Sequence, residues 1–403
     1  MGAFSSARRC IKGMPGVRRL HRRILINRYL KRNRTNWNAR YWNDDLQCLV
    51  LSGSWKDIGQ KVGLIGPVDQ FVDAALLRFD RLKDEEKTAI ISRSYDSLHN
   101  ATKNFPQIPA MLEGLAHGSG VQFDRLVAAH FVTALDTEAP YRSCGAIGAL
   151  TSNGPVFAQA LDLGLTNLTA TALIVPDDGP RILVHMNLGS LWFTSGVNSH
   201  GLIVGGASVN AKKSADQPAP CFPHTFVQFS CLVNASSVSD AKRLIKQELP
   251  FGAAGDASTH LLIDNHTMAI AEIVGRVSDF RSCDKGAVTS HFLSPKMCHH
   301  HAEDSLSLLR LKESKMRALN SKKFFERNQL DADSLADFLA TDVHQGGWFR
   351  AGLFPDDGWT TSRYVLDNQS CTLASWHGAI DKAGLPKTTS LSALSAKNDF
   401  IFL

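Results

Sequence analysis

Two apolar runs joined by a short polar turn constrain the fold of this chain more than any other segment. The first run covers residues 141–150 and the second covers residues 155–161, with Thr151-Ser152-Asn153-Gly154 between them. An Asn-Gly pair between two such runs favours a β-hairpin. Cys144 stands near the start of the first run, and Asp162 follows the second. We therefore expect a hairpin with a thiol and a carboxylate near the same end.

The thiol of Cys144 has more than one interpretation. Most cysteines outside disulfides are small buried hydrophobic residues. A cysteine that opens a strand gains chemistry if the chain is cut between Ser143 and Cys144, because the new α-amine has a pKa near ~8 and can accept the thiol proton. Asp162 would then orient the amine. A papain-like Cys–His pair stays open as well, although such a thiol is usually placed at the start of a helix.

Charge is distributed unevenly along the 403 residues. Residues 1–43 hold twelve Lys or Arg and no acid, whereas the other 360 residues hold 32 basic and 38 acidic side chains. The basic extension fits a transit peptide, a membrane-surface helix, a nucleic-acid arm or a solvated tail. We do not expect a nucleic-acid partner. No apolar stretch reaches the ~20 residues of a spanning helix, so we expect a soluble protein.

Cysteine spacing and standard motifs exclude several classes. The eight cysteines include no Cys-x-x-Cys pair, which favours reduced thiols in the cytoplasm or an organelle. Cys298-His299-His300-His301 is interpreted as an exposed run, so no metal is expected. The sequence has no Gly-x-Ser-x-Gly elbow, P-loop, Gly-x-Gly-x-x-Gly or His-Glu-x-x-His. We expect no cofactor.

The hydrophobic pattern changes at Cys144. Before it, a strand is expected over residues 46–52, followed by a helix that begins after the cap residue Ser54. Further helices are expected over residues 68–104, 109–117 and 123–135. After it, strands are expected over residues 170–176, 181–185, 202–208, 259–264 and 268–274, and helices over 222–249, 303–319 and 332–339. We divide the chain into a basic extension (1–43), a mainly helical segment (44–143) and a core (144–403).

Several short motifs occur in a fixed order from Leu46 onward. They lie at residues 51–59, 112–121, 196–202, 260–264, 269–272, 289–292 and 307–310, with Cys144 and Asp162 between the second and third. In this order the chain resembles the cysteine-type N-terminal-nucleophile hydrolases of the isopenicillin N acyltransferase type (acyl-CoA:6-aminopenicillanic acid acyltransferase, peptidase C45-type).

The resemblance implies a four-layer αββα sandwich and autoproteolysis between Ser143 and Cys144. It implies an acyl-Cys144 intermediate, with Cys144, Asp162 and Ser290 catalytic and Ser290 at the oxyanion. The substrate would be a small-molecule acyl-amide or acyl-thioester. We further expect Ser208 and Asn210 to face the substrate. Arg310 is expected to hold a substrate carboxylate, with a structural acid as its partner or a place on the helix surface as the alternatives.

Departures from the family pattern keep two other functions open. Gly145 follows the nucleophile where the family has Thr or Ser, and Ala160 and Leu161 replace an Arg or Gln and an Asn before the acid. Ser290 replaces an Asn whose amide contributes to the oxyanion hole. One alternative is therefore a catalytically impaired binding or scaffold protein. The other is a papain-like hydrolase without self-cleavage.

Overall fold

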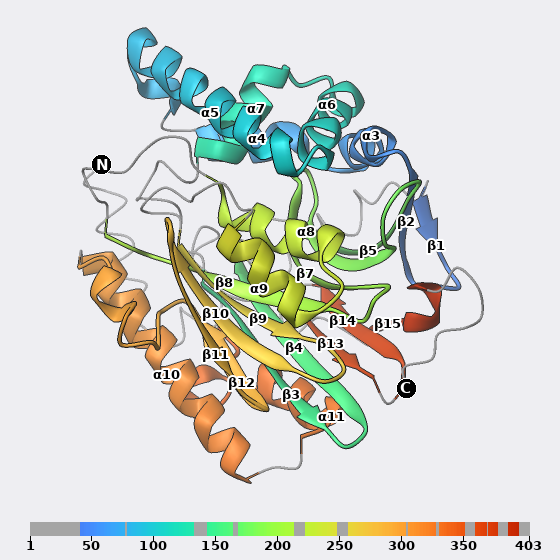
Figure 1. Cartoon of the computed structure of the whole chain (residues 1–403), viewed down its shortest axis with the longest axis vertical. Helices are drawn as coiled ribbons and strands as arrows, with labels where there is room; N and C mark the ends of the chain where they lie inside the picture. Colours follow the sequence, from blue (N-terminus) through green and yellow to red (C-terminus); the bar gives the residue numbers. More distant parts are fainter. Residues whose placement is uncertain are drawn as a thin grey trace, which may run out of the picture.

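The computed structural model describes most of the chain beyond the basic extension (Figure 1). The described residues are 41–76, 79–132, 143–163, 168–212, 222–247, 257–303, 305–327, 330–350, 359–368, 370–377 and 386–394. The expected extension over residues 1–43 lies almost wholly outside them. None of the helices in these ranges is long and apolar enough to cross a membrane.

Within these ranges, the larger sheet has nine strands in the order β1-β2-β5-β6-β7-β8-β9-β10-β11. They are β1 (Trp42–Asn43), β2 (Cys48–Gly53), β5 (Thr169–Pro176), β6 (Ile182–Asn187), β7 (Trp192–Asn198), β8 (Ile203–Val209), β9 (Ala257–Ile263), β10 (Met268–Val274) and β11 (Val277–Ser282). The β2–β5 pair is parallel and brings the segment before Cys144 into the same sheet as the segment after it. The expected strands over 46–52, 170–176, 181–185, 202–208, 259–264 and 268–274 are confirmed to within two residues at either end.

The described part of the smaller sheet has six antiparallel strands in the order β12-β3-β4-β13-β14-β15. They are β3 (Ser143–Thr151), β4 (Gly154–Leu163), β12 (Lys285–Thr289), β13 (Trp359–Asp367), β14 (Thr372–His377) and β15 (Lys387–Ser390). β3 and β4 form the expected hairpin, with Thr151 opposite Gly154 at the turn. Gly154 has φ +100°, a left-handed conformation that glycine adopts without strain.

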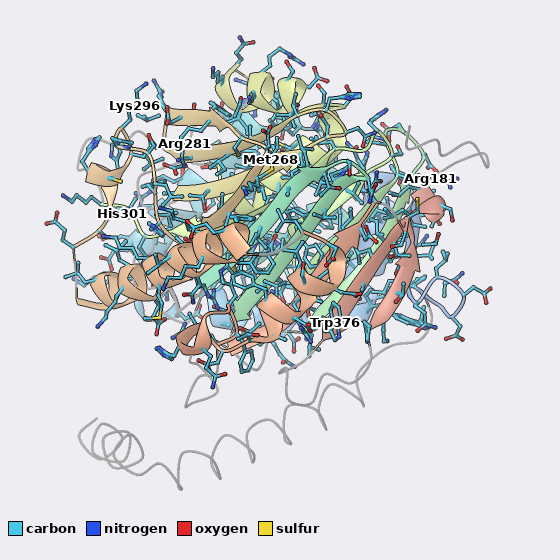
Figure 2. The ribbon with its side chains drawn as sticks, turned by 90° about the horizontal axis from the view of Figure 1, so that it is seen from below. Arg181, Met268, Arg281, Lys296, His301 and Trp376 are labelled. Carbon is cyan, nitrogen blue, oxygen red and sulfur yellow. The ribbon has the colours of Figure 1, made fainter. Side chains whose placement is uncertain are left out.

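The two sheets pack face to face, and helices cover both outer faces. Side chains from both sheets share one inner core, for example Phe157, Leu183, Leu261 and Tyr364. α8 (His224–Asn234) and α9 (Val238–Gln247) cover the larger sheet, whereas α10 (Ser305–Arg327) and α11 (Ala332–Ala340) cover the smaller one (Figures 1 and 2). The expected αββα sandwich is therefore confirmed.

Two expected helices are interrupted. The single helix predicted over residues 222–249 is two helices, because Ala235 is extended (φ −118°, ψ 140°) and ends α8. The hydroxyls of Ser236 and Ser237 then bind the Asp240 carboxylate and start α9. The pattern over residues 68–104 likewise divides into α4 (Val68–Leu76), a short 3-10 turn (Phe79–Arg81) and α5 (Asp84–Asn104).

The other helices before Cys144 gather at one end of the molecule (Figure 1). They are α3 (Trp55–Ile65), α6 (Gln107–Ser119) and α7 (Phe123–Val132). Ser54 caps α3 in a capping box with Asp57, as predicted. Backbones of α3 and α6 touch through glycine: a Cβ on Gly114 would lie 2.0 Å from the Lys56 carbonyl oxygen. Glycines in residues 51–59 and 112–121 therefore allow the close packing of α3 against α6.

Candidate active site

The β3–β4 hairpin places the thiol and the carboxylate on opposite faces of the smaller sheet. Cys144 is paired with Leu161, and residue 143 is paired with Asp162. Paired residues share a face, and successive residues alternate. The Cys144 side chain packs with Trp192 and Ala207 of the larger sheet, so it points inward between the sheets. Asp162 points outward, toward α10.

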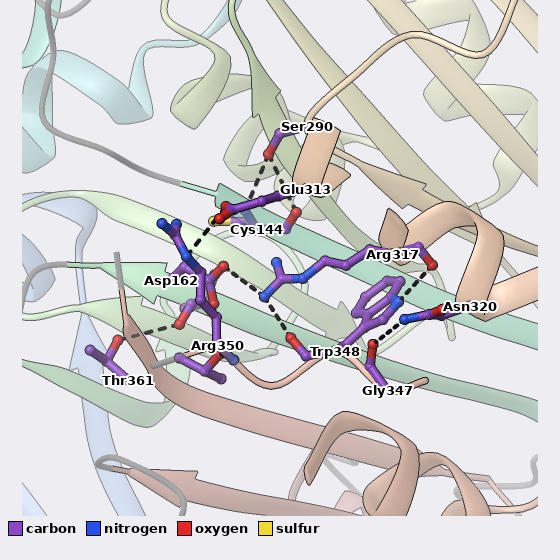
Figure 3. Close-up of polar contacts among 12 residues, drawn as sticks. Cys144, Asp162, Ser290, Glu313, Arg317, Asn320, Gly347, Trp348, Arg350 and Thr361 are labelled. Atoms are coloured by element: carbon purple, nitrogen blue, oxygen red, sulfur yellow. Dashed lines mark hydrogen bonds and ion pairs between the residues drawn. The ribbon is translucent and has the colours of Figure 1, made fainter. Parts of the chain in front are cut away.

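Ser290 touches the main chain of the proposed nucleophile. The Cys144 amide donates to the Ser290 hydroxyl oxygen at 3.3 Å, and that hydroxyl donates to the Cys144 carbonyl oxygen at 3.4 Å (Figure 3). Ser290 directly follows β12, whose last residue, Thr289, pairs with Gly145. The hydroxyl therefore lies where the chain would carry its new α-amine after a cut at residue 143.

Asp162 is fully buried and lies between two donors. Arg317 of α10 places its Nη2 at 2.7 Å from Oδ2, and the hydroxyl of Thr360 donates to Oδ1 at 2.8 Å. Arg317 is itself only 3% exposed at its side chain. Burial raises the pKa of Asp162, and the positive charges of Arg317 and Arg350 act against that rise. A buried carboxylate beside a buried guanidinium is a costly arrangement, which fits a functional site as well as a structural one.

A second ion pair lies close to the first. Arg350 places its Nε at 3.4 Å from Glu313 Oε2, with side chains 16% and 28% exposed. The Arg350 amide donates to Thr360 Oγ1 at 2.9 Å, so the Arg350 main chain and Asp162 bind the same hydroxyl. Glu313 and Arg317 lie one turn apart on α10. One helix therefore supplies both the cation that pairs with Asp162 and the carboxylate that pairs with Arg350.

Trp348 explains why glycine follows Cys144. A Cβ on Gly145 would lie 2.7 Å from Cζ3 and 2.9 Å from Cη2 of the fully buried Trp348 ring. Threonine or serine, which the family pattern has here, would collide with this ring. The glycine that follows Cys144, where the family pattern has Thr or Ser, thus leaves the space that Trp348 fills from about 200 residues further along the chain.

On the inner face, Gln159 joins the two sheets. Its amide group donates to the carbonyl oxygens of Thr194 and Gly206 at 3.3 and 3.1 Å. Its Oε1 accepts from the Gly206 amide and from the Tyr364 hydroxyl, both at 3.2 Å. Burial raises the pKa of Tyr364 well above its usual value, and Cys144 adds to this rise.

The residues expected to face the substrate lie on different elements of the fold. Ser208 of β8 is half-buried and paired with Ser258 in β9. The Asn210 carbonyl oxygen accepts from the Ala302 amide at 3.0 Å. Arg310 lies in α10, but its side chain is outside the described part of the structure. Their roles in binding stay predictions.

No group of three or more metal-ligating side chains converges within the described residues. The Cys298 to His301 run forms a 3-10 turn there.

Sequence reasoning missed the partners of Asp162. Arg317 follows Arg310 by seven residues, two helical turns, so both sit on a similar face of α10. That periodicity could have indicated Arg317 as an alternative to Arg310 for binding a carboxylate. Thr360, Trp348 and Gln159 carry no local signal, because their contacts are made across strands or between distant segments.

Comparisons with known proteins agree with the expected family. Residues 164–345 match the sequence model of the family acyl-coenzyme A:6-aminopenicillanic acid acyl-transferase. The matched segment contains Ser290 and Arg317 but begins after Cys144 and Asp162. A search of curated proteins finds no match.

Three solved structures are similar at low identity. Conjugated bile acid hydrolase from Clostridium perfringens is 10% identical over 58% of this chain and 89% of its own, with a TM-score of 0.37. Penicillin V acylase from Agrobacterium tumefaciens is 13% identical over 58% and 82%, with a TM-score of 0.34. The Caenorhabditis elegans orthologue of N-acylethanolamine-hydrolyzing acid amidase is 12% identical over 56% and 93%, with a TM-score of 0.39.

Proposed function

Because residues 164–345 match this acyltransferase family, we propose that the chain is an N-terminal-nucleophile enzyme that hydrolyses or transfers acyl groups through Cys144. The observation that carries the proposal is the position of Cys144. It opens β3 with its main chain bonded to Ser290, while the buried Asp162 stands opposite the residue before it. The substrate class is a small acyl-amide or acyl-thioester.

Activation would begin with attack of the Cys144 sulfur on the carbonyl carbon of Ser143. The peptide C–N bond breaks, a thioester forms, and the proton moves to the nitrogen of residue 144. Water then hydrolyses the thioester, which leaves a carboxylate on Ser143 and a thiol and α-amine on Cys144. The amine has a pKa near ~8, so it can take the thiol proton at neutral pH.

Turnover would repeat the same chemistry on a substrate. The thiolate attacks the substrate carbonyl, the protonated amine donates to the departing amine or thiol, and an acyl thioester remains on Cys144. Water or an acceptor amine then takes the acyl group. Asp162 orients the α-amine by charge. Ser290 would accept a hydrogen bond from that amine, as its hydroxyl accepts one from the Cys144 amide, in addition to the oxyanion role expected from the family pattern.

A cut at residue 143 would leave the two fragments associated. β2 lies in the first fragment and is hydrogen-bonded along five residue pairs to β5 in the second. Trp55 of α3 packs edge-on against Phe229 of α8, with ring centroids 5.6 Å apart. We therefore expect both fragments to co-purify and to separate only in denaturant.

Intact-mass measurement and N-terminal sequencing test the proposal. Wild-type protein should yield fragments of about 143 and 260 residues, the second beginning with Cys144. Cys144→Ala should remain a single chain. Cys298→Ala is the matched control, because Cys298 is exposed and distant in sequence, and it should be cut like the wild type.

The same samples separate the alternatives. A thiol-directed acylating probe should label Cys144 in the cut protein and lose its target in Cys144→Ala. A single chain without labelling would refute the proposal and support a binding or scaffold protein. A single chain whose Cys144 still labels would support a papain-like hydrolase.

A further inference from the structure

We infer that Trp348 is a positioning residue for the reaction at Cys144, an inference that rests on the proposed function. Its indole ring fixes the main chain at Gly145, and its hydrogen bonds tie that position to the Arg317–Asp162 pair. Trp348 touches no reacting atom in this scheme. It acts through the backbone of residues 144 and 145 and through Arg317.

The contact with Gly145 is close enough to set the backbone position. The space that a Cβ would need at Gly145 is occupied by the outer atoms of the six-membered indole ring. Gly145 is also paired with Ala160 on one side and Thr289 on the other, so it cannot move sideways in the sheet. The ring therefore covers the outer face of β3 at Gly145, directly after the proposed nucleophile, and prevents the backbone from moving outward there.

Trp348 is held in place by reciprocal hydrogen bonds with α10. Its Nε1 donates to the Arg317 carbonyl oxygen at 3.1 Å and to Ser321 Oγ at 3.0 Å. Arg317 Nη2 donates back to the Trp348 carbonyl oxygen at 2.6 Å. Asn320 adds a bond from its side-chain amide to the Gly347 carbonyl oxygen at 3.0 Å (Figure 3). A fully buried ring with these bonds has little freedom to rotate.

The same Arg317 nitrogen serves Asp162 and Trp348. Nη2 lies 2.7 Å from Asp162 Oδ2 and 2.6 Å from the Trp348 carbonyl oxygen. A shift of the ring would therefore change two things together: the main chain after Cys144 and the guanidinium that holds the carboxylate. Displacing reacting groups by about 1 Å can cost on the order of 10²-fold in rate.

The test is a double-mutant cycle on the rate of self-cleavage. Gly145→Ala introduces the Cβ that the ring excludes, and Trp348→Phe removes the outer ring atoms that it would meet. Wild type, both single variants and the double variant are made by cell-free translation, and cleavage is followed over time on denaturing gels. Near-ultraviolet circular dichroism and thermal unfolding in the Cys144→Ala background report the fold of each variant.

We expect Gly145→Ala and Trp348→Phe each to slow cleavage by roughly 10-fold or more, and the double variant to cleave faster than the product of the two losses predicts. A purely structural contact would lower the unfolding temperature while folded chains of both single variants cleave at the wild-type rate, and that result would overturn the inference. Two losses that simply multiply in the double variant would also overturn it. A wild-type chain that stays uncut would refute the proposed function and the inference with it, whereas the two preceding results refute the inference alone.

Discussion

Replacing Arg317 with methionine should expose how strongly the fold depends on the Asp162 ion pair. Both side chains are buried, and their charged atoms lie 2.7 Å apart. Methionine keeps most of the volume but leaves the carboxylate with the Thr360 hydroxyl as its nearest donor and Arg350 as a more distant cation. Removing one partner of a buried pair typically costs about 3–5 kcal/mol. We expect a loss of unfolding free energy in that range at pH 8, far above the ordinary aspartate pKa.

The loss should depend on pH with a defined sign. Without Arg317, the pKa of Asp162 in the folded state rises further above its unfolded value of about 4. A folded pKa above the unfolded one gives stability that is present at low pH and is lost as pH rises. The loss of unfolding free energy caused by Arg317→Met should therefore be larger at pH 8 than at pH 5. Adding Asp162→Asn should recover part of the loss at pH 8.

Urea unfolding followed by tryptophan fluorescence measures both effects, in the Cys144→Ala background so that each sample is one chain. Arg281→Met is the matched control. Glu272, its partner at 2.8 Å, is also buried, but Arg281 is 39% exposed and Glu272 keeps amide donors from Leu293 and Ser294. We expect Arg281→Met to lower the free energy of unfolding by about 1 kcal/mol. Equal losses in the two variants, or a loss from Arg317→Met that does not change with pH, would refute the reasoning.

Three further outcomes are expected. His130 donates to the Leu126 carbonyl oxygen and accepts from the Leu191 amide, and burial lowers its pKa to about 4. The free energy of unfolding should therefore fall by up to about 3 kcal/mol as pH falls from about 6.5 to 4. His130→Gln should flatten this pH profile in urea unfolding. Asn198→Ala removes four hydrogen bonds of a buried side chain and should cost about 3 kcal/mol by the same unfolding assay, with an unchanged midpoint refuting it. Gly114→Ala forces α6 from α3 and should cost at least about 2 kcal/mol in thermal unfolding.

The hairpin and its carboxylate could be predicted because their signal is local. Apolar runs, an Asn-Gly turn and the position of Asp162 all lie within about twenty residues. The partners of Asp162 could not be predicted in the same way. α10 carries both Arg310 and Arg317, and its orientation over β12 and β3 decides which of them meets the carboxylate. That orientation comes from tertiary packing, including Trp348.

Strand order shows the same limit. β13 lies beside β4 in the smaller sheet, with Thr360 opposite Asp162, although the two strands are nearly 200 residues apart in the sequence. β11 was not expected either, because its residues are mostly half-buried and polar and it lies at one end of the described larger sheet. The split of residues 222–249 into two helices depends on hydroxyl caps at Ser236 and Ser237. The residue types indicate a capping stretch there, but the helical periodicity continues across it.

For protein engineering, the opposite orientations of Cys144 and Asp162 divide the site into two sets of positions. Trp192 and Ala207 face the sulfur from the larger sheet, whereas Arg317 and Trp348 hold the carboxylate side from α10 and the segment beyond it. Under the proposed function, a mutant library directed at the first set would change the shape offered to an acyl group and leave the Arg317–Asp162 pair intact. Selection for new acyl preferences should therefore begin on β7 and β8.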